Sequence, residues 1–422
     1  MVNNRDTVER LRCPEAARPK TERPLPDGWQ WVRLGDVCEF NPRRPDLKRT
    51  PETPTTFVQM SAVDDVTGVV IRPEIKNYEE VRKGYTFFAE EDVLFAKITP
   101  CMQNGKHAVA RNLIDGIGFG STEFHVIRSK GEIAADWIHK FVRQTWVLQG
   151  ATAHFTGAVG QQRVPVSYLS ELQIPLPPLS EQKRIAGILN EQMGAIERAR
   201  AATEAQLEAA KALPAAYLRE VFDSEEAKKW PKKKLRDVCT IATGTTPSRA
   251  CPEYFGEGIA WVTPGDFNGD IYIPNGRECI TELGFKKGRA RLFPPKTVLL
   301  VCIGATIGKA GIASKEISAN QQINALICNP EIQSEFLYFH LKHDRADFIS
   351  AAASATLPII NQARLGEREI PLPPVEEQER ISAILLDQII KTENAEKALK
   401  AKLDTINKLP AALLRRAFNG EI

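Results

Sequence analysis

The strongest constraint on the fold is a long internal repeat. About half of the residues between Ile174 and Phe222 recur in the same order, without a gap, between Ile370 and Phe418. Both copies open with Ile-Pro-Leu-Pro-Pro, continue through Glu-Gln and Arg-Ile, and close with Leu-Pro-Ala-Ala. Each copy follows a stretch of globular composition that differs from the other. A repeat at this spacing predicts two variable modules carried on one duplicated frame.

Each copy of the repeat is predicted to form a long helix. The prolines at its start fix φ and remove N–H donors, so the helix should begin after them. Apolar residues then recur at alternating spacings of four and three, the heptad pattern of a two-stranded coiled coil. Gln192 and Gln388 occupy the same seam position, where a buried polar residue would fix the register. From Ser180 to about Ala212 the helix would extend ~50 Å. Pro214 and Pro410 predict a kink or break near each end.

The two helices are expected to pair with each other. A helix with a narrow apolar stripe cannot bury that stripe alone, and the second copy supplies a complementary one. We expect an antiparallel pair within the chain, with the two modules related by a pseudo-two-fold axis. A parallel pair, which would put both modules at the same end, is one alternative. The other is that each helix packs only on its own module.

The modules themselves are predicted to be α+β. Short β-type runs are punctuated by glycine, proline and asparagine, which is typical of an irregular, largely antiparallel sheet. Trp29 and Leu34 of the first module are echoed at constant offset by Trp230 and Leu235 of the second. The predicted regions are a disordered arm (1–23), a first module (24–178), a central helical region (179–222), a second module (223–373) and a distal helical region (374–422).

Composition argues for a cytoplasmic protein. The 422 residues are 43% hydrophobic and 26% charged with a net charge of +3, which is ordinary for a globular chain. No apolar run reaches the roughly 18–20 residues that span a bilayer, and the polar N-terminus does not resemble a secretory signal. The net charge is too small to identify a nucleic-acid partner by itself.

No catalytic or metal-binding motif is expected. The eight cysteines are scattered without a Cys-x-x-Cys pair, which argues against a disulfide framework or a zinc site. His340 and His343 lie on a predicted helix without a cysteine or carboxylate at zinc spacing, so no metal site is predicted. Phosphate-binding, dinucleotide-binding and amino-methyltransferase motifs are missing from the sequence. We therefore predict a protein that is not an enzyme.

Several motifs occur in a fixed order between Pro24 and Phe418. Pro-Leu-Pro-Asp-Gly-Trp at 24–29 precedes Leu-Gly-Asp-Val at 34–37, and the Ile-Pro-Leu-Pro-Pro-x-x-Glu-Gln-x-Arg-Ile element occurs twice. The second module adds Thr-Gly-Thr-Thr-Pro-Ser at 243–248 and Trp-Val-Thr-Pro-Gly-Asp at 261–266. In this order the motifs resemble those of the specificity (S) subunits of type I restriction-modification enzymes.

The resemblance implies a non-catalytic subunit that recognises double-stranded DNA. Each module would be a target-recognition domain that reads one half of a split, asymmetric sequence. The helices would set the spacer and dock two modification (methyltransferase) subunits, and a restriction subunit would join the larger complex. The chain itself would hold no cofactor, because S-adenosylmethionine and ATP would be bound by the partner subunits.

Physical reasoning independently supports a split target. Half-sites read from one side of a duplex lie about one helical turn, ~34–36 Å, apart. A stiff helix pair can hold two modules at such a separation, and two different readers predict an asymmetric site. Two alternatives stay open: a DNA-binding protein outside restriction that uses the same frame, and a scaffold without nucleic-acid contact.

Polar clusters in the modules are the candidate DNA contacts. Amide side chains suit adenine edges, whereas guanidinium and ammonium groups suit guanine edges and phosphates. For each cluster an ordinary polar turn is the alternative. The candidates are Lys97, Thr99, Gln103, Asn104, Lys106, Gln161, Gln162 and Arg163 in the first module, and Thr245, Thr246, Ser248, Arg249, Lys309, Gln321, Gln322 and Asn361 in the second. The candidate partner-docking residues, at the start of each helix, are Glu181, Gln182, Arg184, Glu377, Gln378 and Arg380.

Overall fold

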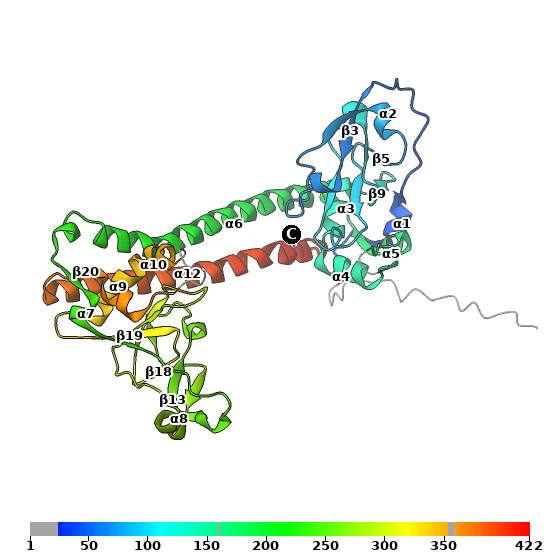
Figure 1. Cartoon of the computed structure of the whole chain (residues 1–422). Helices are drawn as coiled ribbons and strands as arrows, with labels where there is room; N and C mark the ends of the chain where they lie inside the picture. Colours follow the sequence, from blue (N-terminus) through cyan, green and yellow to red (C-terminus); the bar gives the residue numbers. More distant parts are fainter. Residues whose placement is uncertain (1–23, 159–160, 353–358) are drawn as a thin grey trace, which may run out of the picture. The chain divides into compact units, whose positions relative to one another are not determined.

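The computed structural model describes residues 24–158, 161–352 and 359–422. The expected disordered arm, 1–23, lies outside the described residues. The chain divides into two compact units, Met1–Thr203 with Lys402–Ile422, and Glu204–Ala401. Each unit combines one sheet-bearing module with parts of the two long helices α6 and α12 (Figure 1). The predicted α+β class is confirmed.

The first module contains two four-stranded sheets. One has the antiparallel order β2-β9-β6-β7, and the other has the order β4-β3-β8-β5 with β3 and β8 parallel. A separate pair, β1 with β10, joins the two ends of the module. The elements are β1 (Gln30–Arg33), α1 (Leu34–Val37), β2 (Cys38–Phe40), β3 (Pro54–Val58), β4 (Glu74–Asn77), α2 (Tyr78–Val81), β5 (Thr86–Ala89), β6 (Val93–Ala96), β7 (His107–Val109), β8 (Ile117–Gly120), β9 (Phe124–Ser129), α3 (Ala135–Val142), α4 (Thr145–Ala153), α5 (Val166–Glu171) and β10 (Gln173–Leu176).

The second module repeats this plan. A five-stranded sheet has the order β12-β19-β16-β17-β14, a three-stranded sheet has the order β15-β13-β18, and β11 pairs with β20. The elements are β11 (Lys232–Lys234), α7 (Leu235–Val238), β12 (Cys239–Thr243), β13 (Phe255–Val262), β14 (Tyr272–Ile273), β15 (Glu278–Ile280), α8 (Glu282–Lys287), β16 (Val298–Val301), β17 (Ala310–Ala313), β18 (Ser318–Ala319), β19 (Ile323–Cys328), α9 (Ser334–His343), α10 (Arg345–Ala352), α11 (Gln362–Gly366) and β20 (Glu369–Pro371).

The two modules are topologically equivalent over their main sheets. The order β2-β9-β6-β7 in one corresponds to β12-β19-β16-β17 in the other, and the parallel pair β3–β8 corresponds to β13–β18. The central strands β6 and β16 are buried along their whole length, so they read as continuous apolar runs rather than as alternating ones. The weak sequence similarity between the two modules therefore reflects a shared fold.

The long helices α6 (Leu179–Phe222) and α12 (Val375–Phe418) each contain 44 residues. Both continue past their internal prolines, so of the predicted kink or break at Pro214 and Pro410 the break does not occur. A proline removes only one helical N–H, and packing beyond it holds the last turns in place. Leu218 is buried in the core of the second unit, and Phe418 in that of the first.

Contacts inside each unit show that the two helices run antiparallel, as predicted. In the first unit, Ile185 near the start of α6 shares a core with Leu414 near the end of α12. In the second unit, Leu218 near the end of α6 shares a core with Ile381 and Leu385 near the start of α12. The start of each helix is thus packed beside the end of the other.

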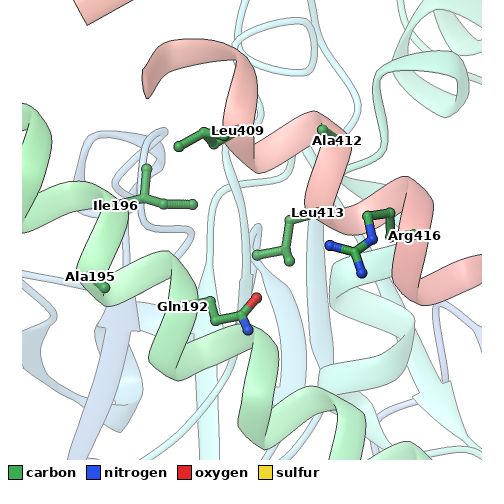
Figure 2. A pocket seen from close by; sticks show the side chains of 7 residues that line it. All are labelled: Gln192, Ala195, Ile196, Leu409, Ala412, Leu413 and Arg416. Carbon is green, nitrogen blue, oxygen red and sulfur yellow. The ribbon is translucent and has the colours of Figure 1, made fainter. Parts of the chain in front are cut away.

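The predicted seam glutamines are not buried. Gln192 is exposed and Gln388 is half-buried. Gln192 lines an open hollow of about 340 Å³ between the start of α6 and the end of α12, opposite Leu413 and Arg416 (Figure 2). Thr203 and Thr392 are buried instead. Each hydroxyl donates to the carbonyl four residues earlier in its own helix, at 2.7 and 2.8 Å, so it needs no partner across the seam.

Candidate nucleic-acid interface

In the first module, the loop after β6 lies beside the segment that precedes α5. Ile98 and Arg163 form an isolated β-bridge, and the Thr99 N–H donates to the Gln162 carbonyl at 3.1 Å. The Val164 N–H donates to the Lys97 carbonyl at 2.9 Å. Two candidate clusters that are far apart in sequence therefore form one surface, which we call loop edge 1 (residues 97–106, 121–123 and 161–163).

Arg163 is held in a fixed orientation on loop edge 1. Its guanidinium donates to both carboxylate oxygens of Glu123, each at 2.8 Å. These hydrogen bonds lower the pKa of Glu123 and raise that of Arg163. Lys97 lies nearby, where burial lowers its pKa. Glu123 gave no local sequence signal, because its pairing with Arg163 depends on the fold.

The remaining candidates on loop edge 1 differ in solvent exposure and in whether their polar atoms already bind the protein. Gln103 and Asn104 are exposed, and Thr99 Oγ1 donates to Gln103 Oε1 at 2.8 Å. Lys106 is different, since its Nζ donates to the Val63 carbonyl at 2.8 Å and so helps to hold the loop. Gln161 is exposed and Gln162 is half-buried.

The second module brings its own candidates together at the equivalent ends of its strands. The Thr245 N–H donates to the Ala319 carbonyl at 2.8 Å, and Thr246 Oγ1 is hydrogen-bonded to Gln321 Oε1. The Ile360 N–H donates to the Cys302 carbonyl at 2.9 Å. We call this surface loop edge 2; it comprises residues 243–249, 302–309, 320–322 and 359–361.

Arg249 is the most strongly organised cation of loop edge 2. Its guanidinium lies 4.2 Å from the ring centroid of Phe255 and 5.2 Å from that of Trp261. It also donates to both carboxylate oxygens of Glu278, at 3.1 and 2.6 Å, which raises its pKa. The side chain is still 55% exposed. A planar cation held on an aromatic platform, with part of its edge open, suits bidentate recognition of a base or phosphate.

Lys309 and Asn361 have structural roles in loop edge 2. Lys309 Nζ donates to the Phe267 carbonyl at 3.1 Å, matching the role of Lys106 in the first module. Asn361 is exposed, but its Oδ1 accepts from the Arg364 N–H at 2.8 Å and caps α11. Ser248 is exposed, and Gln322 is half-buried beside Asn320, whose Nδ2 donates to Gln322 Oε1 at 3.0 Å.

Gly244 fixes the path of the loop that carries Arg249. A Cβ at this position would lie 2.2 Å from the Asn320 carbonyl oxygen and 2.4 Å from that of Ala319, so the backbone would have to move. We expect Gly244→Ala to lower the free energy of unfolding of the second unit by about 1–3 kcal/mol, measured by urea denaturation, because the backbone has to move to accommodate the added methyl group. Gly265→Ala is the matched control, since a Cβ at that position of the same module would lie no closer than 3.6 Å to its neighbours. Equal effects of both changes would contradict the role of Gly244.

The candidate docking residues divide into a buried and an exposed set. Gln182 and Gln378 are fully buried, so the prediction that they contact a partner is wrong. Gln182 accepts from the Ala134 N–H at 2.7 Å and donates to the carbonyls of Glu132 and Pro177, at 3.1 and 2.8 Å. Gln378 repeats these bonds with Gln333 N–H and the carbonyls of Glu331 and Pro373, at 2.9, 3.0 and 2.8 Å. Each glutamine clamps its long helix to its own module.

The other docking candidates remain on the surface. Arg184 pairs with Glu181, and Arg380 with Glu377, through bidentate contacts in which the shorter N···O distances are 2.7 Å. Hydrogen bonding to the arginine lowers the pKa of each glutamate. The two pairs are placed identically in the two copies of the repeat, so they present the same chemistry twice.

Comparisons with known proteins agree with this duplicated plan. The family model for the type I restriction modification DNA specificity domain matches the chain twice, at residues 26–209 and 227–405. The chain is 34% identical over 219 residues to the EcoEI specificity subunit of Escherichia coli, and 37% identical over 173 residues to the EcoAI subunit. These matches cover 51% and 41% of this chain, and 36% and 29% of the relatives, so the chain spans about a third of their length.

Solved structures show the same architecture. The crystal structure of the HsdS subunit from Thermoanaerobacter tengcongensis superposes with a TM-score of 0.68 at 26% identity, covering 95% of this chain and 99% of that one. A chain from a study of complex assembly and conformational transition of the type I R-M system superposes with a TM-score of 0.73, also at 26% identity, covering 95% and 100%. With two matches of the family model across most of its length, the chain belongs to the type I restriction modification DNA specificity family.

Proposed function

We propose that the chain directs a DNA methyltransferase to a bipartite, asymmetric target, with one module reading each half. The observation that carries the proposal is the pair of equivalent modules whose loop edges differ in chemistry. Loop edge 1 presents Arg163 on Glu123 beside amide side chains, whereas loop edge 2 presents Arg249 on an aromatic platform beside hydroxyls. A common scaffold with unlike contact surfaces supports recognition of two unlike half-sites.

The loop edges suggest how each half would be read. A guanidinium can donate two hydrogen bonds to the O6 and N7 atoms of guanine, and amide side chains match the adenine edge. Hydroxyls and backbone N–H groups would bind phosphates and fix the register. The partner enzyme has to flip its target base out of the duplex, so the modules would hold the flanking DNA still during that step.

The duplicated surface at the start of α6 and α12 supports docking of two modification subunits, one per repeat. The exposed pairs Glu181–Arg184 and Glu377–Arg380 would belong to these surfaces. In this proposal S-adenosylmethionine is bound by the modification subunits, and ATP by a restriction subunit that joins them. The chain would act as a non-catalytic subunit in the cytoplasm. Within the described residues, no helix is both long and apolar enough to cross a membrane.

Co-expression with the methyltransferase from the same locus tests this function. Single-molecule sequencing of host DNA should reveal modified adenines in a split asymmetric motif only when this chain is present. A stable complex without a modified motif would contradict the proposal. Failure to form any complex would favour a DNA-binding role outside restriction, and salt-insensitive DNA retention would favour a scaffold, because phosphate contacts make binding strongly salt-dependent.

Arg249→Ala is expected to impair one half-site selectively. Loss of a bidentate base contact costs about 1–3 kcal/mol, which corresponds to roughly a 5- to 150-fold lower modification rate. The second half-site should become relaxed in sequence while the first stays unchanged. Arg277→Ala is a suitable control, since Arg277 is an exposed arginine of the same module that donates to the Gly265 carbonyl. A uniform loss across all DNA sequences would indicate a phosphate contact instead.

A further inference from the structure

A cluster of metal-ligand side chains lies at the C-terminal end of α9. His340, His343 and Asp344 are spaced i, i+3 and i+4, so they share one face of the helix. One nitrogen from each histidine and a carboxylate oxygen of Asp344 all lie within 4.8 Å of one another. This end of a helix carries partial negative charge from the aligned peptide dipoles, which favours a cation.

The environment of His340 is the main evidence for a bound ligand. It is only 7% exposed, and neither of its ring nitrogens has a hydrogen-bond partner within the described part of the chain. Its Nε2 lies 3.5 Å from Asp344 Oδ2, which is an ion-pair distance rather than a hydrogen bond. Leaving a buried polar atom unsatisfied costs about 1–3 kcal/mol, so a ligand in this position would remove that cost.

His343 is oriented in the way that metal-binding histidines usually are. Its Nε2 lies 3.0 Å from Asp223 Oδ1, and its Nδ1 lies 2.9 Å from Asp344 Oδ1. His343 Nδ1 and Asp344 Oδ1 are at hydrogen-bond distance, so they share a proton when no cation is bound. A cation between these two atoms takes the place of that proton, while the Nε2–H donates to Asp223. A carboxylate behind a histidine ligand fixes its ring and raises its basicity. Asp223 follows the end of α6, so it also connects that helix to the cluster.

Asp344 is shared with a neighbouring arginine. Arg368 Nη2 lies 3.0 Å from Asp344 Oδ2, and the Arg368 guanidinium stacks on Phe348 at 4.1 Å. A carboxylate has about four lone pairs, so it can accept from Arg368 and still ligate a cation. The positive charge of Arg368 weakens the site relative to one without it.

We propose that His340, His343 and Asp344 bind one divalent transition-metal cation of the zinc type. The ligands are His340 Nε2, His343 Nδ1 and an Asp344 oxygen, and water takes the fourth position of a tetrahedral shell. Asp344 directly follows His343 in the sequence, and Asp223 reaches the cluster only through the fold, so the spacing of these residues does not match a zinc motif. The cation stabilises the junction between α9 and the end of α6 in the second unit.

The first module provides an internal comparison. Ala134 and Gln333 are equivalent positions, because their N–H groups donate to the equivalent glutamines Gln182 and Gln378. Counted from these two positions, His340, His343 and Asp344 correspond to Phe141, Gln144 and Thr145. Phe141 packs on Phe418 at 5.6 Å as His340 packs on Phe222 at 5.3 Å. The same fold position therefore accepts phenylalanine and glutamine, which makes His340→Phe with His343→Gln a well-tolerated double variant.

The test is Zn²⁺ titration of the metal-free full-length chain by calorimetry, with X-ray absorption of the loaded protein. We expect one Zn²⁺ per chain with nitrogen and oxygen ligands. The affinity should fall by more than about 100-fold in the double variant and in Asp344→Asn, because loss of a ligand costs more than loss of a group that supports one. Asp223→Asn keeps all three ligands and should lower the affinity by about 10- to 100-fold. His154→Gln in the first module should leave the affinity unchanged.

Two results would overturn the proposal. One is an equal Zn²⁺ affinity in the wild-type chain, the double variant and Asp344→Asn. The other is a sulfur-containing shell, which would place the ion on cysteines such as the paired residues Cys239 and Cys328. Circular dichroism separates a folded variant that has lost the ion from an unfolded one, and Asp344→Asn supplies the answer if the double variant does not fold.

Discussion

Replacing residues 24–178 with the equivalent module of a relative is expected to change one half of the modified sequence completely and leave the other half intact. Each module has its own core, and its loop edge is built only from residues of that module. Modification of the original motif should fall to background, and a hybrid motif should replace it. Single-molecule sequencing of host DNA measures both changes in one experiment.

The exchange depends on keeping the attachment of the module to its helix. The donor module must supply the backbone groups that Gln182 binds. It must also supply an aromatic residue at the position of Trp137, whose ring centroid lies 4.2 Å from that of Phe418. The matched control exchanges residues 223–373 and should alter only the other half. A single exchange that changed both halves would contradict modular reading.

Gln378→Ala is expected to destabilise the second unit by about 3 kcal/mol, because it leaves the Gln333 N–H and two carbonyls without their partner. Gln182→Ala should act in the same way in the first unit. Urea unfolding of the full chain gives the free-energy change, and hydrogen exchange at the Gln333 amide should accelerate locally. Glu379→Ala changes an exposed neighbour and should alter the stability by less than about 0.5 kcal/mol.

Gln378→Ala also tests whether this glutamine affects only stability or also the orientation of the second module. If Gln378 only positions α12 on its module, the half-site sequence should stay the same in Gln378→Ala while the modification rate falls with the folded fraction. A stability loss no larger than that of Glu379→Ala would show that water replaces the glutamine without cost. A changed half-site in a fully folded variant would instead indicate that the clamp sets the orientation of the second loop edge.

The sequence alone determined the plan of the molecule. Proline stops and heptad spacing are local signals, and their duplication between Ile174 and Phe418 made the two long helices and their antiparallel pairing predictable. The α+β class followed from short β-type runs punctuated by turn residues. The polar clusters around Lys97, Gln161 and Thr245 were also visible, because hydroxyl and amide residues concentrate there.

Only the tertiary structure decided which residues face solvent and which act together. Gln182 and Arg184 lie on the same turn and look equally suited to a surface, yet the fold buries the glutamine against backbone groups far away in sequence. The same is true of the charged partners: Glu123 pairs with Arg163, and Glu278 pairs with Arg249. Asp223 likewise reaches His343 from a distant segment of the chain. Local patterns report helix period and turns, whereas side-chain partners depend on strand order and on how each module meets its helix.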